Sequence, residues 1–78
     1  MKIALTMERA VELAQCFNDL YDASPGKFAP STHTSATWNE TDGRAELQHW
    51  NQGYCVSTDL TEGEASSSLE HDKRISLL

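Results

Sequence analysis

The stretch that decides the fold is Ser35–Leu60, with the sequence SATWNETDGRAELQHWNQGYCVSTDL. Polar and apolar residues alternate along it with a period of two, which is typical of strands that have one buried face. Two turn signals interrupt the alternation: Thr41-Asp42-Gly43-Arg44 contains Asp-Gly, and Asn51-Gln52-Gly53 contains a second glycine. The stretch therefore predicts a three-stranded antiparallel meander over residues 35–60.

The turn lengths also predict which side chains share a face. A two-residue loop at Asp42-Gly43 pairs Thr41 with Arg44, Trp38 with Leu47 and Ala36 with His49. At the second turn, a loop of two or four residues puts Tyr54 and Val56 on the face of Leu47, and a three-residue loop puts them opposite. Because burial favours the first choice, we expect an inner face of Ala36, Trp38, Ala45, Leu47, His49, Tyr54 and Val56, with Thr58 left open.

A helix is predicted at about residues 6–22, ahead of the meander. Thr6 is suited to cap its N-terminus, and apolar residues from Met7 to Tyr21 cover half of the helical wheel. Asp22-Ala23-Ser24-Pro25-Gly26 ends the helix. The connection over 23–34 is rich in turn residues, and Phe28 is expected to anchor it in the core.

The C-terminal segment, residues 61–78, has a low-complexity, flexible character. Ser67 and Glu70 form a capping-box pattern that favours a short helix over about 68–76. A fourth strand at Arg74–Leu78 and a frayed tail are the alternatives. The chain is thus expected to be a single α+β domain, 1–78, in which one amphipathic helix packs on the meander.

The helix has an acidic row on the face opposite its apolar half. Glu8, Glu12, Gln15, Asp19 and Asp22 are spaced by four, three, four and three residues, so they stand above one another. Like charges at this spacing repel, so local helix stability does not explain the row. Arg9 lies at its border and is expected to compensate it little. We call these five residues the acidic stripe.

Composition limits the functional classes. The chain has 78 residues and a net charge of −6, which disfavours nucleic acid or an anionic membrane as the direct partner. A protein with a basic surface is the favoured partner. The absence of a long apolar run and of a signal-peptide pattern leads us to expect a cytoplasmic protein.

No catalytic or metal pattern is recognisable in the sequence. Cys16 and Cys55 are expected to be free thiols, with a disulfide as the alternative. His33, His49 and His71 match no zinc spacing, and His49 is expected to be a hydrogen-bonded histidine of the inner face. We therefore expect no cofactor, no metal and no enzymatic activity.

Trp50 is the one large apolar residue expected on the outer face, where it would be a binding anchor. The alternative is that the tail, Phe28 or a different register covers it.

The order helix, three strands, helix resembles in outline the double-stranded-RNA-binding domains. Such domains grip phosphates with a basic helix, and this chain offers only Lys73 and Arg74 there. The resemblance therefore implies no RNA binding.

The sequence thus favours a small acidic inhibitor of a protein, of the kind that phages and mobile elements direct against host nucleases or defence proteins. Its carboxylates, with Trp50 as a further contact, would occupy a basic, nucleic-acid-binding surface. The alternative is a structural or accessory subunit, such as a homodimer, whose interface is Trp50 and the tail leucines.

Overall fold

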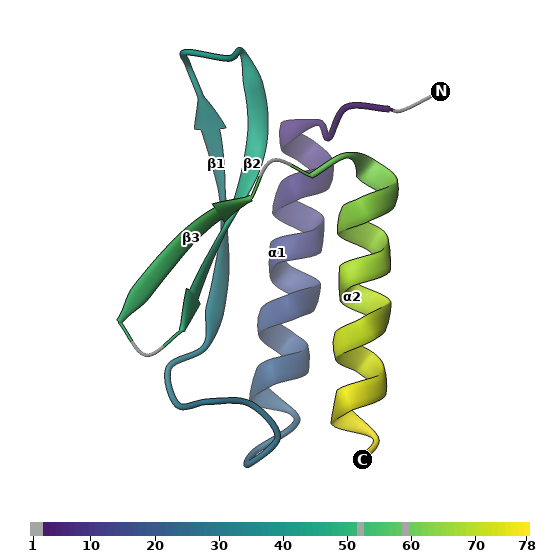
Figure 1. Ribbon diagram of the computed structural model, residues 1–78. Coiled ribbons are helices and arrows are strands. Elements are labelled where there is room, and N and C mark those ends of the chain that lie inside the picture. The colour runs from purple at the N-terminus through teal and green to yellow at the C-terminus, as the bar shows by residue number, and fades with distance from the viewer. Residues whose placement is uncertain (1–2, 52, 59) are drawn as a thin grey trace.

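The computed structural model describes residues 3–51, 53–58 and 60–78, and it has the α+β fold that the sequence predicts. Helix α1 spans Met7–Asp22, the strands β1, β2 and β3 span His33–Asn39, Arg44–Asn51 and Tyr54–Thr58, and helix α2 spans Glu62–Ser76. The strands form one antiparallel sheet in the order β1-β2-β3. Both helices lie on the same side of this sheet, side by side, and α1 is the one nearer to it (Figure 1).

Helix α1 begins and ends as its sequence predicts. The Thr6 hydroxyl accepts a hydrogen bond from the backbone N–H of Arg9, as an N-cap residue should. The apolar face packs into a core that also receives residues of β2 and α2. This core consists of Leu5, Ala10, Leu13, Ala14, Phe17, Tyr21, Ala45, Leu47, Ala65 and Leu69. Phe28 packs against it, with its ring edge-on to Tyr21 at 4.7 Å between centroids, so the predicted anchor is confirmed.

The predicted register of the first hairpin is wrong by two residues. Asn39, not Thr41, pairs with Arg44, so Ala36 lies opposite Leu47. The cause is a four-residue loop: the Asn39 side-chain oxygen accepts a hydrogen bond from the backbone N–H of Asp42, and the Asn39 backbone carbonyl accepts one from the N–H of Gly43. Gly43 has φ 65°, which glycine adopts without strain. A shift of two residues leaves every side chain on its predicted face.

Burial of that inner face differs from the prediction. Ala45 and Leu47 are buried, but Trp38, Tyr54 and Val56 are 53%, 77% and 57% exposed. The reason is the position of the helices: α1 packs on β1 and β2, and within the part of the chain that the structure describes neither helix packs closely on β3. On the outer face, expected to be plain polar surface apart from Trp50, the Glu46 side chain is buried and accepts a hydrogen bond from Asn39.

The C-terminal segment is a long helix rather than a flexible stretch with a short helix or a fourth strand. Its capping box is Thr61 with Glu64, not Ser67 with Glu70: Glu64 donates its backbone N–H to the Thr61 hydroxyl, and its carboxylate accepts the Thr61 backbone N–H. Ala65 and Leu69 are buried on one face of the helix. These two residues form the apolar part of the contact between α2 and α1.

Candidate protein-binding surface

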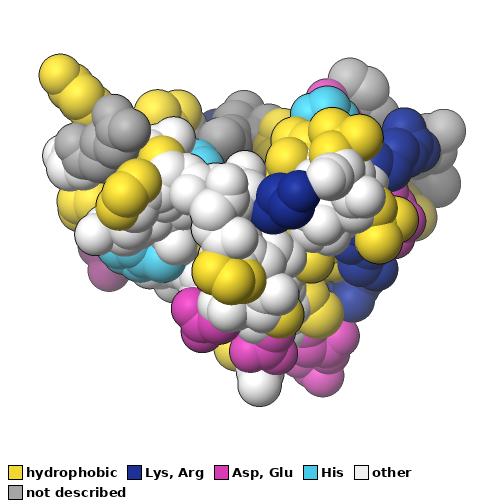
Figure 2. Space-filling view, turned by 90° about the horizontal axis from the view of Figure 1, so that it is seen from below, with side chains coloured by type: hydrophobic (Ala, Val, Ile, Leu, Met, Phe, Trp, Pro, Cys, Tyr) yellow, Lys and Arg dark blue, Asp and Glu magenta, His cyan; other side chains and the backbone are white. Residues whose placement is uncertain are grey.

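The acidic stripe lies on the exposed side of α1. All five of its residues are exposed, as the helical pattern predicts: Glu8, Glu12, Gln15, Asp19 and Asp22. At about 1.5 Å per residue, the row from Glu8 to Asp22 is about 21 Å long. Seen from below, acidic side chains gather along the lower edge of the molecule (Figure 2).

Arg9 compensates the stripe more than the sequence suggests. Its Nε donates to Glu62 of α2 at 2.8 Å, and its Nη1 contacts Glu12 at 3.2 Å. These hydrogen bonds, with Glu62 first, raise the pKa of Arg9, so it stays a cation. Its main partner was not foreseen, because Glu62 lies in the segment expected to be flexible.

The remaining carboxylates of the stripe are open to a partner. Within residues 3–51, 53–58 and 60–78, Arg9 is the only cation in an ion pair with a stripe residue. Two other basic groups are engaged elsewhere: Lys27 donates to the carbonyl of Leu78, and Lys73 pairs with Glu70. Glu8, Asp19 and Asp22 therefore present unneutralised charge to solvent.

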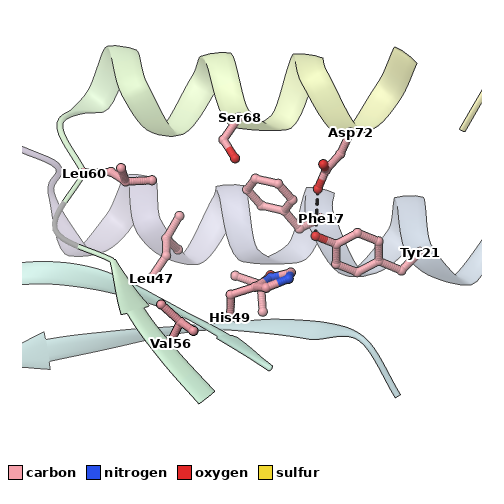
Figure 3. A pocket seen from close by; sticks show the side chains of 9 residues that line it. Phe17, Tyr21, Leu47, His49, Val56, Leu60, Ser68 and Asp72 are labelled. Atoms are coloured by element: carbon pink, nitrogen blue, oxygen red, sulfur yellow. Dashed lines mark hydrogen bonds between the residues drawn. The ribbon is translucent and has the colours of Figure 1, made fainter. Parts of the chain in front are cut away.

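A second feature, absent from the sequence prediction, is a groove of about 300 Å³ between the sheet and α2. Helix α1 forms its floor, α2 one wall, and β2 and β3 the other (Figure 3). The residues that line it are Phe17, Tyr21, Thr34, Leu47, His49, Val56, Leu60, Ser68 and Asp72.

The polar end of the groove is organised around Tyr21. Its hydroxyl donates to Asp72 Oδ2 at 2.9 Å, joining α1 to α2 (Figure 3). Burial and the hydrogen bond to this carboxylate raise the pKa of Tyr21, so the ring stays neutral in the physiological range. The Tyr21 ring is also edge-on to His49, at 6.0 Å between centroids.

His49 has the role that the sequence predicts. Its Nδ1 lies 3.2 Å from the Thr34 hydroxyl, a hydrogen bond within the inner face. Among the described residues, no three His, Cys, Asp or Glu side chains converge in a way that could hold a metal ion. The Tyr21–Asp72 and Thr34–His49 hydrogen bonds thus join the elements that line the groove.

Trp50 faces outward, as predicted, but it is half-buried. Its cross-strand neighbour His33 stacks on it, with 5.7 Å between ring centroids and 3° between ring planes. Cys55 is beside it in the sheet register, and both Cys16 and Cys55 are exposed free thiols. The tail residues Leu77 and Leu78 are 85% and 86% exposed.

No described helix is both long and apolar enough to cross a bilayer. Comparisons with protein-family models, with characterised proteins and with solved structures find no match for this chain. The fold and the surface define a small α+β protein with an acidic helix face and an open groove on the opposite side of that helix.

Proposed function

We propose that this protein is a small inhibitor that binds another protein through the carboxylates of α1. The observation that carries the proposal is the continuous exposed stripe, in which Arg9 neutralises Glu12 alone among the described contacts. Four like charges on one helical face cost stability, so a partner that supplies the opposite charge accounts for them.

The proposed partner has a basic surface that normally binds nucleic acid. Along the helix axis the four carboxylates are about 6, 10.5 and 4.5 Å apart, which averages about 7 Å, whereas one DNA strand has a phosphate about every 3.4 Å. The stripe thus resembles about every second phosphate of a strand. Arg and Lys side chains placed for phosphates could donate charge-assisted hydrogen bonds to these carboxylates.

The identity of the partner is a finer part of the proposal. A host nuclease or defence protein, blocked by a phage or mobile-element protein in the cytoplasm, fits a short acidic chain with an unneutralised helix face. Affinity capture from host lysate followed by mass spectrometry tests this. The expected retained protein binds DNA or RNA, and added nucleic acid displaces it.

Salt dependence separates this function from that of an accessory subunit. If four carboxylates make the contact, affinity should fall by up to about a hundredfold between about 50 and 200 mM salt. An apolar interface made by Trp50 and the exposed Leu77 and Leu78 would be insensitive to salt and would fail on Trp50→Ala. That second pattern would contradict the inhibitor proposal.

A further inference from the structure

The two edge strands of the sheet, β1 and β3, differ in how their outward backbone groups are hydrogen-bonded. At the β1 edge, Asn18 of α1 bonds both free backbone groups of Thr34: its Nδ2 donates to the Thr34 carbonyl, and its Oδ1 accepts the Thr34 N–H, each at 2.8 Å. A side chain thus takes the place of a neighbouring strand. Asn18 therefore caps the β1 edge at Thr34.

The β3 edge has no such cover among the described residues. Thr34 points its backbone N–H and C=O groups away from β2, so Thr34 and His49 are a non-hydrogen-bonded pair of the antiparallel ladder. The backbone groups of His49 therefore point toward β3, and those of its partner Val56 point back toward β2. Cys55 and Ser57 therefore point their N–H and C=O groups outward. No backbone hydrogen bond from another described segment reaches Cys55.

The composition of β3 also lacks the usual protection of an edge strand. Natural edges carry Lys, other charges or Pro that prevent pairing with another chain. Tyr54–Thr58, YCVST, has none of these, and the nearest charged residue along the chain is Asp59. Tyr54 and Val56 add exposed apolar surface on the inner face, and Val56 lines the groove.

We propose that the β3 edge pairs with the β3 edge of a second copy of this chain, in an antiparallel arrangement. The charge distribution selects this occupant. The stripe lies on the exposed face of α1, away from the buried face that packs toward the sheet, and β3 itself is uncharged, so two copies of charge −6 can meet here with the least repulsion. A basic partner would instead be drawn to the stripe.

The outward groups fix the register. A two-fold axis beside Val56 pairs Cys55 with Ser57 of the second copy, and the N–H and C=O of both residues are then bonded. Val56 faces Val56 of the second copy as a close, non-hydrogen-bonded pair on the inner face. Because equal positions meet, both inner faces lie on one side of a continuous six-stranded sheet, and the two grooves open toward each other.

The mass of the wild-type protein in solution tests the proposal. Sedimentation equilibrium from about 10 µM to about 1 mM should show twice the chain mass of 8.7 kDa at the upper end. Added salt should strengthen the dimer, since it screens the repulsion between two acidic chains. Salt should weaken stripe binding, so the two proposals can fail separately. A monomer at every concentration would overturn the dimer.

Variants test the register. Val56→Lys puts two like charges opposite each other and should lower the association constant by at least about tenfold. Trp38→Lys is the matched control, since Trp38 is similarly exposed on the same face but lies in β1. It should leave the dimer intact.

Val56→Glu should also be monomeric alone, and an equal mixture with Val56→Lys should dimerise again. Circular dichroism of each variant checks its fold. If Val56→Lys fails to fold, the mass of the wild-type protein and the mass of the Val56→Glu variant in solution test the proposal instead. A dimer that survives both folded substitutions, or that Trp38→Lys abolishes, would contradict pairing through β3.

Discussion

The hydroxyl of Tyr21 joins the two helices, and its titration should be visible in the stability of the protein. Because burial and the Asp72 carboxylate raise the pKa of Tyr21 above its ordinary value of 10.0, the folded state holds this proton more tightly than the unfolded chain. The stabilisation is fully present below about pH 10 and is lost as pH rises further.

We therefore expect the unfolding free energy of the wild type to fall in the alkaline range, and Tyr21→Phe to flatten this dependence. The variant should also lose about 1–2 kcal/mol at neutral pH, because it leaves Asp72 without its donor. Urea unfolding at a series of pH values measures both effects. A Tyr21→Phe protein with the alkaline slope of the wild type would show that another group titrates.

Asn18 makes the second prediction at this scale. Asn18→Ala removes both hydrogen bonds to the backbone of Thr34 and should cost about 2 kcal/mol, because Thr34 is buried and its backbone groups would be left unpaired. Asn51→Ala, at an exposed position of β2, is the control and should change stability by less than about 0.5 kcal/mol. Equal effects of the two changes would mean that the edge does not need its cap.

Among the elements, α2 departs most from the sequence prediction, and its N-cap tests the reason. Thr61→Ala should cost about 1 kcal/mol, since the Thr61 hydroxyl accepts the Glu64 N–H at the helix start. Ser67→Ala, at the position that the sequence suggested as the cap, lies in an exposed part of the helix and should be nearly neutral. Thermal or urea unfolding of the pair measures this. A larger loss from Ser67→Ala would place the helix start later than the structure does.

The elements with a clear period were predictable, and those without one were not. Residues 7–21 and 35–60 show their periods in the chain, so α1 and the meander follow from the sequence. The first turn was placed correctly but with the wrong loop length, because the Asn39 side chain extends the turn beyond Asp-Gly. Helix α2 was missed over its first turns because Ser66, Ser67 and Ser68 suggest a loop, whereas Ala65 and Leu69 secure it against α1.

The two candidate sites differ in the same way: the acidic stripe follows from a sequence period, and the groove does not. The exposure of the stripe follows from helical spacing alone and is confirmed. The groove depends on where α2 lies relative to β3, and no local pattern encodes that. Its participants Tyr21 and Asp72 are 51 residues apart, and Asp72 belongs to the segment expected to be flexible. The Thr61 and Glu64 capping box was the signal that could have revealed it.

At the scale of the whole molecule, the acidic stripe of α1 and the unpaired edge of β3 lie on different sides. Helix α1 carries the acidic stripe on its exposed face, while Phe17 and Tyr21 on its buried face line the groove together with Val56 of β3. One surface suits a basic partner, and the other suits an uncharged strand. Under these proposals the protein can be a dimer that presents two acidic faces, and binding at one surface need not disturb the other.

The most direct test of the central proposal compares two charge-reversed variants in affinity capture from host lysate. Glu12→Lys with Asp19→Lys changes the stripe, and Glu40→Lys with Glu70→Lys changes exposed carboxylates outside it. Each pair of changes takes the net charge from −6 to −2, since two reversals add four. Each also removes one exposed ion pair, Arg9–Glu12 or Lys73–Glu70.

The proposal predicts that the stripe variant loses the partner, while the control and the wild type retain it at about 50 mM salt. Equal retention by both variants would contradict a role for the stripe.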